Sequence, residues 1–211
     1  MKNEQIIANH LLQINAIKLN PAKPFTWASG WKSPIYCDNR KTLSYPEIRT
    51  AICESFVQTI EKQYNNIDGI AAVATGAIGI GALVAQKMNL PLVYIRASSK
   101  GHGLENRIEG AYSKGQRYVV VEDLISTGKS SLSAVDALKQ AGCTVLGMVA
   151  IFTYNFQQAV DNFVNADCKL TTLSDYNHLI DAATESGYIK EDQVELLKDW
   201  RNNPSTWMQN S

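Results

Sequence analysis

The sequence predicts an α/β fold in which a doubly wound, mainly parallel sheet carries helices on both faces. Between residues 67 and 175, apolar runs of strand length alternate with stretches of helical periodicity. These runs are apolar throughout, as is typical of strands buried on both faces of a parallel sheet. With 211 residues, 45% of them hydrophobic, the chain can bury a substantial core, and we expect a single domain over residues 1–211.

Charge, cysteine content and hydropathy disfavour several other classes of protein. Lys+Arg 20 balance Asp+Glu 20, and a formal net charge of zero argues against a general nucleic-acid binder. The 4 cysteines form no CxxC pair and no zinc-type cluster, which favours reduced thiols. The N-terminus shows no signal-peptide cleavage site, and no apolar run approaches the ~20 residues of a membrane span. We therefore expect a cytoplasmic protein without a nucleic-acid or membrane partner.

The first 41 residues are predicted to form a helix followed by a small lobe. Ile7, Leu11 and Ile14 recur at helical spacing within about the first 17 residues. Residues 20–41 are rich in proline, tryptophan and small side chains, a composition that suits an ordered lobe better than a flexible linker.

The next helix is predicted from a start signal and an apolar face. Ser44 is the expected N-cap, and Pro46 stands where a first helical turn accepts proline. The strands that follow are expected at 67–74, 90–97, 117–124, 143–152 and 169–175. The helices between them are expected near 81–88, 131–142 and 156–164, and the tail has two more helical stretches.

The segment VVVEDLISTGKSS, residues 119–131, has the composition of a sugar-phosphate site. Hydroxyl side chains and a glycine open a helix at 126–131, where backbone N–H groups can hold a phosphate. Glu122 and Asp123 end the preceding strand, and their carboxylates can accept hydrogen bonds from ribose hydroxyls.

Two other interpretations of this segment are weaker. Its TGKS matches the end of a P-loop, but Asp123 stands at the position of the first P-loop glycine and would repel a phosphate. Alternatively, the acids cap a turn and the hydroxyls only start a helix. Two acids at the end of a fully apolar strand are uncommon, which disfavours this second interpretation.

A glycine-rich turn, ATGAIGIG at 74–81, follows an earlier strand. Its pattern is GxxGxG rather than GxGxxG, and the next strand ends in Arg96 rather than an acid, so a nicotinamide site is disfavoured. From the residues alone, a structural turn and a loop that binds an anion through its backbone remain equally open.

The polar loop from Arg96 to Gly110 carries Lys100, His102 and Arg107 among several glycines. A loop of this length without its own structure is usually functional or disordered. Cations among glycines can close over a polyanion and release it again, which favours a lid. A solvated connection is the alternative.

Together these segments resemble a known family. Residues 119–131 resemble the 5-phosphoribosyl-1-pyrophosphate signature of the type I phosphoribosyltransferases. RASSKGHG, residues 96–103, resembles the catalytic loop of the orotate phosphoribosyltransferase family, and FTWASGWKSPIYCDNR, residues 25–40, resembles its base-covering region. The resemblance runs from about residue 5 to the final helices. It implies the type I phosphoribosyltransferase fold, with residues 1–41 as a helix and base-covering hood.

The resemblance also implies a reaction and its partners. The phosphoribosyl group of 5-phosphoribosyl-1-pyrophosphate would pass to orotate, giving orotidine 5'-monophosphate and pyrophosphate in pyrimidine biosynthesis. Magnesium (Mg2+) is the implied cofactor, held mainly by substrate oxygens. A homodimer is implied, with lid residues that act across the interface. A phosphoribosyltransferase for another nucleobase and a non-catalytic nucleotide-sensing regulator are the alternatives.

The family's site residues carry over by position. The implied catalytic residues are Arg96, Lys100 and His102. The same three are implied to contact phosphoribosyl pyrophosphate, together with Glu122, Asp123, Leu124, Ile125, Ser126, Thr127, Gly128, Lys129 and Ser130. Ser126 is also implied to contact orotate, and no metal-ligating residue is implied.

Four positions depart from the family's common pattern. Residues Ala28, Ile78, Ala97 and Asn155 stand where many members have a cation. Lys32 lies four residues after Ala28. Because such losses occur together in a subgroup of the family, they do not imply a loss of activity.

Overall fold

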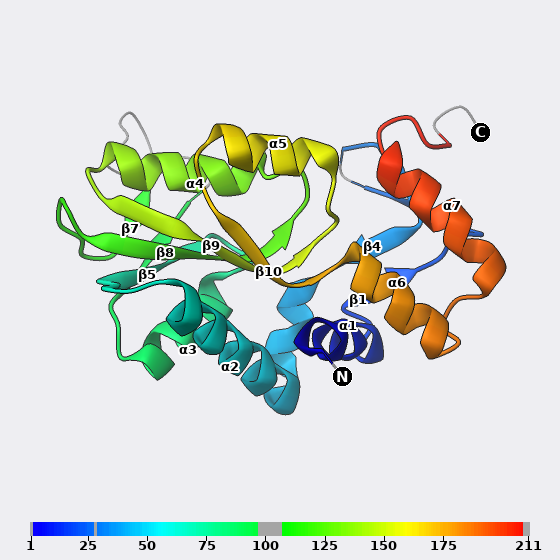
Figure 1. Cartoon of the computed structure of the whole chain (residues 1–211), viewed down its shortest axis with the longest axis horizontal. Helices are drawn as coiled ribbons and strands as arrows, with labels where there is room; N and C mark the ends of the chain where they lie inside the picture. The colour runs from blue at the N-terminus through cyan, green and yellow to red at the C-terminus, as the bar shows by residue number, and fades with distance from the viewer. Residues whose placement is uncertain (1, 28, 97–106, 209–211) are drawn as a thin grey trace.

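The computed structural model describes residues 2–27, 29–96 and 107–208, and its centre is a six-stranded sheet (Figure 1). The strand order is β10-β9-β8-β5-β6-β7. The strands are β5 (Gly69–Val73), β6 (Leu92–Ile95), β7 (Ile108–Glu109), β8 (Arg117–Ile125), β9 (Thr144–Thr153) and β10 (Leu170–Asp175). Each neighbouring pair is parallel except β6 and β7, which are antiparallel. The predicted mainly parallel sheet is therefore confirmed.

Helices cover both faces of this sheet, as predicted. In Figure 1, α4 (Lys129–Gln140) and α5 (Gln157–Asn165) lie on one face, and α2 (Pro46–Gln63) and α3 (Ile78–Met88) lie on the other. Side chains alternate along each strand, so β5 contributes Ile70 and Ala72 to the core under α2 and α3. Its residues Ala71 and Val73 join the second core, under α4 and α5. This two-sided burial explains the continuous apolar strand sequences.

The N-terminal lobe packs beside the C-terminal helices (Figure 1). After α1 (Asn3–Gln13), strand β1 (Ile17–Leu19) pairs antiparallel with β4 (Ile35–Cys37), and β2 (Phe25–Thr26) pairs with β3 (Lys32–Ser33). Two helices follow the sheet, α6 (Tyr176–Glu185) and α7 (Glu191–Asn202).

Trp200 of α7 connects these two parts of the chain. Its side chain is fully buried, lies 5.6 Å from the Trp27 ring and 5.8 Å from the Tyr154 ring, and donates a hydrogen bond to the Lys32 carbonyl oxygen. The described part of the segment at 20–41 therefore packs against α7 through Trp27 and Lys32.

Several predicted boundaries are wrong. The first helix ends at Gln13 because Asn15 adopts a left-handed conformation and the chain then enters β1. Ser44 is not an N-cap: it ends a short 3-10 helix, η1 (Asn39–Ser44), and Tyr45 precedes Pro46 without a side-chain cap. The short strands β1 to β4 and β7 were not predicted, because their two or three residues show no measurable periodicity. Across the described ranges, we find no helix with the length and apolarity that a membrane crossing needs.

Candidate active site

The main candidate site is a cavity at the carboxyl ends of β5 and β8. Between these neighbours the chain order reverses, since β6 lies on the other side of β5, and such switch points are where open α/β sheets bind ligands. The cavity measures about 480 Å³. Its described lining comprises Cys37, Asp38, Arg40, Val73, Ala74, Thr75, Gly76, Glu122, Asp123, Leu124, Ser126, Thr127, Gly128 and Ser130. Three predicted regions, the glycine turn, the acidic pair and the hydroxyl loop, therefore meet in one place.

The two acids at the end of β8 have different environments. Glu122 is 4% exposed; one carboxylate oxygen accepts the Asp123 backbone N–H at 2.8 Å, and the other accepts the Ser131 hydroxyl at 2.7 Å. Asp123 is half-buried, so its carboxylate is the more accessible of the two. Burial, together with hydrogen bonding and charge repulsion from Asp123, raises the pKa of the Glu122 carboxyl well above its usual value.

Glu122→Gln is expected to change how stability depends on pH. Because the pKa of Glu122 is higher in the folded chain than in the unfolded chain, the free energy of unfolding should fall as pH rises above the ordinary value of 4.5. A glutamine has a similar shape but cannot ionise, so this variant should lose that part of the decline. Urea unfolding between about pH 5 and 8 measures it, with Glu61→Gln on the exposed surface of α2 as the control. An unchanged pH slope in Glu122→Gln would contradict the assignment.

The hydroxyl loop is shaped to expose backbone donors. Gly128 has φ +78° at the start of α4, and a Cβ there would lie 2.8 Å from the Phe163 ring, so glycine is required. Asn162 of α5 donates a hydrogen bond to the Thr127 carbonyl oxygen at 2.9 Å. The first turn of α4 has no side-chain cap, which leaves its backbone N–H groups available to an anion.

The glycine turn after β5 packs directly against Asp123, the second residue of the acidic pair. A Cβ on Gly76 would collide with the Asp123 carboxylate, and a Cβ on Gly81 would lie 2.7 Å from the Ala72 Cβ. The Ala74–Thr75 peptide bond is cis. The first of these glycines therefore makes room for the Asp123 side chain, whereas Gly81 allows α3 to approach the sheet.

The predicted lid residues are only partly covered by the described ranges. Lys100, His102, Ala97 and Ala28 lie outside the described residues. Arg96 directly follows β6, its guanidinium pairs with Glu109 at 3.2 Å, and it is not among the cavity's lining residues.

Of the other predicted site residues, most line the cavity and two do not. Glu122, Asp123, Leu124, Ser126, Thr127, Gly128 and Ser130 line the cavity. Ile125 is fully buried in the core under α4 and α5, so only its backbone could meet a ligand. Lys129 is exposed and is not among the lining residues.

The N-terminal lobe lines the cavity with residues that no pattern in the sequence singles out as site residues. Asn39 is 1% exposed and donates a hydrogen bond to the Asp123 carbonyl oxygen at 2.6 Å, which brings Cys37, Asp38 and Arg40 to the cavity. Burial and the charges of Asp123 and Asp38 raise the pKa of the Cys37 thiol well above 9.0, so it remains protonated and is a poor nucleophile. Only the resemblance of 25–40 to a base-covering region signals this contribution.

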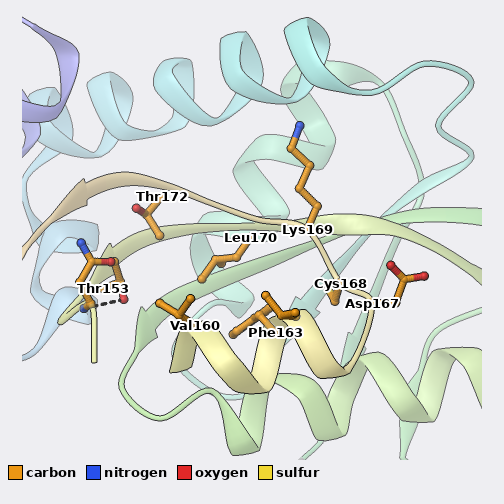
Figure 2. A pocket seen from close by; sticks show the side chains of 10 residues that line it. Thr153, Val160, Phe163, Asp167, Cys168, Lys169, Leu170 and Thr172 are labelled. Atoms are coloured by element: carbon orange, nitrogen blue, oxygen red, sulfur yellow. Dashed lines mark hydrogen bonds between the residues drawn. The ribbon is translucent and has the colours of Figure 1, made fainter. Parts of the chain in front are cut away.

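A second cavity lies at the sheet edge between α5 and β10 (Figure 2) and measures about 540 Å³. Figure 2 shows Val160 and Phe163 of α5 facing Leu170 of β10 across it. Asn155, one of the four departures, lines this groove. Because it contains none of the predicted site residues, it is not the candidate active site.

The fold and the first cavity define a class of protein, the phosphoribosyltransferases. The family described as "Phosphoribosyl transferase domain" matches residues 43–181. A solved structure of UMP synthase from Leishmania donovani is 27% identical with a TM-score of 0.78, covering 94% of this chain and 42% of its own.

Curated relatives show which kind of phosphoribosyltransferase this chain resembles. An orotate phosphoribosyltransferase from Bacteroides thetaiotaomicron is 55% identical over 208 residues, covering 98% of each chain. One from Porphyromonas gingivalis is 54% identical over 203 residues, covering 96% of this chain and 97% of its own. The chain belongs to the orotate phosphoribosyltransferase family, and it is a transferase enzyme.

Proposed function

We propose that the cavity between β5 and β8 transfers the phosphoribosyl group of phosphoribosyl pyrophosphate to orotate. The products are orotidine 5'-monophosphate and pyrophosphate, a step of pyrimidine biosynthesis. The observation that carries the proposal is the accessible Asp123 carboxylate placed between the glycine turn and the uncapped start of α4. A sugar that bears anionic groups at both ends matches two anion-binding loops that flank a carboxylate.

Different lining residues bind different groups of phosphoribosyl pyrophosphate. Glu122 and Asp123 hold the ribose hydroxyls, and the loop at 126–130 holds the 5'-phosphate through backbone N–H groups and hydroxyls. Thr75 and Gly76 approach the pyrophosphate, because a turn with so little side chain lets N–H groups reach it. Ser126 also contacts the base. Leu124, Ile125 and Lys129 contribute backbone to the same binding loop.

The lid supplies the cations of the proposed mechanism. As the bond from the anomeric carbon to pyrophosphate breaks, positive charge develops on the ribose and negative charge on the leaving group. Lys100 stabilises the departing charge with support from Arg96, and His102 donates a hydrogen bond or proton to a leaving oxygen. Closure of a lid would also exclude water from the reactive sugar.

Magnesium is the proposed cofactor. Among the described residues no group of three or more His, Cys, Asp or Glu side chains is arranged to hold a metal ion. The accessible oxygen donor Asp123 suits a hard cation that is bound mainly through substrate oxygens. When bound, Mg2+ neutralises charge on the pyrophosphate.

A homodimer in the cytoplasm is proposed, with the lid of each subunit closing over the partner's cavity. Subunits of Lys100→Ala and of Asp123→Asn, each inactive alone, are then expected to recover activity when they are mixed. A random mixture of dimers has about half its members with one intact site, so roughly a quarter of the wild-type sites should work. Activity assays after subunit exchange measure this recovery. No recovery, with exchange verified by mass spectrometry, would mean that the lid acts within its own subunit.

An assay with several bases tests the proposed reaction. Orotate, uracil and hypoxanthine are supplied in parallel with phosphoribosyl pyrophosphate, with and without Mg2+, and base consumption is followed by absorbance. Turnover of orotate alone, lost on chelation of the metal, is the expected result. Turnover of a different base would reassign the substrate, and no turnover with any base would favour a nucleotide-sensing regulator.

A further inference from the structure

The cavity has an unusual charge balance for a site that binds anions. Its described lining residues include three carboxylates, Asp38, Glu122 and Asp123, and a single cation, Arg40. On the proposed function, on which this inference rests, both substrates are anions, since one carries phosphate groups and the other a carboxylate. Among the described lining residues, Arg40 alone can offset the repulsion between these substrates and the carboxylates.

The backbone around Arg40 is fixed to the active site. Arg40 lies in η1 directly after β4, and its neighbour Asn39 donates a 2.6 Å hydrogen bond to the carbonyl oxygen of Asp123. The Thr42 hydroxyl in turn donates to the Asn39 carbonyl oxygen at 2.6 Å. Asn39 and Thr42 are each 1% exposed. The start of η1 is therefore hydrogen-bonded to the carboxyl end of β8, where the proposed ribose-binding carboxylates lie.

One hydrogen bond orients the guanidinium of Arg40 and leaves its other donors available to a ligand. Its Nε donates to an Asp38 carboxylate oxygen at 2.6 Å, whereas its two Nη groups make no hydrogen bond to a described residue. The Arg40 side chain is 62% exposed. A guanidinium held through Nε presents its Nη groups as a planar fork, the geometry that binds phosphate or carboxylate oxygens.

We propose that Arg40 is a substrate-binding residue that binds an anionic oxygen group in this cavity through its two Nη groups. Asp38 is the positioning residue that holds the guanidinium in place. Apart from the 5'-phosphate, which the loop at 126–130 binds, two substrate groups have the required chemistry: the pyrophosphate of phosphoribosyl pyrophosphate and the carboxylate of orotate. Each is an oxyanion that can accept two parallel N–H bonds.

Two pairs of ligands show which of these two substrate groups Arg40 binds. Phosphoribosyl pyrophosphate and ribose 5-phosphate differ in the pyrophosphate, and orotidine 5'-monophosphate and uridine 5'-monophosphate differ in the base carboxylate. Calorimetry gives the Kd of each ligand for the full chain and for Arg40→Ala. The variant should bind the first member of one pair about 10-fold or more weakly, while the second member of that pair is unaffected.

Each result decides the matter. A selective loss for phosphoribosyl pyrophosphate assigns Arg40 to the pyrophosphate, and a selective loss for orotidine 5'-monophosphate assigns it to the base carboxylate. If neither pair shows a selective loss, Arg40 binds neither the pyrophosphate nor the base carboxylate, and the proposal is wrong. If the wild-type protein binds none of the four ligands, the proposed function itself fails, and the inference fails with it.

Three variants complete the test. Arg117→Ala removes an arginine at the amino end of β8, the end remote from the cavity, and should leave all four affinities unchanged. Arg40→Lys retains the charge but not the fork, and should recover only part of the lost affinity. Asp38→Asn should weaken the same ligand as Arg40→Ala, but less. Thermal unfolding of each variant shows whether the fold is intact.

Discussion

Gly76→Ala is expected to lower the kcat/KM of phosphoribosyl transfer by about 100-fold or more, because misplacing a reacting group by about 1 Å can have an effect of that size. The added Cβ would occupy the position of the Asp123 carboxylate. That carboxylate ends a side chain that can rotate away, so the chain should still fold. Rotation would, however, remove Asp123 from the place where the ribose hydroxyls bind. Steady-state kinetics with both substrates varied measures the loss.

Gly79→Ala is the matched control for this variant. It adds the same methyl group three residues later, in the first turn of α3, but its Cβ would meet the tip of the Leu43 side chain, 2.7 Å away, rather than a site residue. Its kcat/KM should stay within a few-fold of wild type, with thermal unfolding used to compare the two folds. Wild-type activity in Gly76→Ala would contradict the placement of Asp123 in the site.

Lys100→Ala is expected to lower kcat by about 100- to 1000-fold, the range found when one stabilising donor is removed from a developing charge. On the proposed mechanism, Lys100 acts most strongly as charge develops on the departing pyrophosphate. The affinity for phosphoribosyl pyrophosphate should therefore change much less than kcat. Single-turnover kinetics and calorimetry measure the two quantities separately.

The control for Lys100→Ala is Lys114→Ala, which removes an exposed lysine in the turn before β8. It should leave both kcat and affinity unchanged. Equal losses of kcat and affinity in Lys100→Ala would show that Lys100 binds the substrate and the transition state alike. That outcome would contradict its proposed role in catalysis.

The sequence was informative wherever a local pattern was long enough to carry a signal. The buried strands β5, β8 and β9 were predicted from continuous apolar runs, and their parallel arrangement from the helices between them. Because parallel strands end at the same edge of the sheet, the segments after β5 and β8 could be expected to share a site. The contact of Gly76 with Asp123 is the structural result of that arrangement.

The remaining features depend on contacts between distant segments. Asn39 bonds to a carbonyl 84 residues away, and neither residue type nor spacing in the sequence signals such a bond. The cavity position of Arg40 follows from that contact, and was missed for the same reason. The end of the first helix depended on the left-handed conformation of Asn15, which asparagine tolerates but does not require.

A crystal structure of the chain with phosphoribosyl pyrophosphate and Mg2+ tests the central claim most directly. The 5'-phosphate is expected against the loop at 126–130, the ribose hydroxyls on Asp123 and the pyrophosphate beside Thr75 and Gly76. Electron density for the ligand in the groove between α5 and β10, with the cavity between β5 and β8 empty, would contradict it.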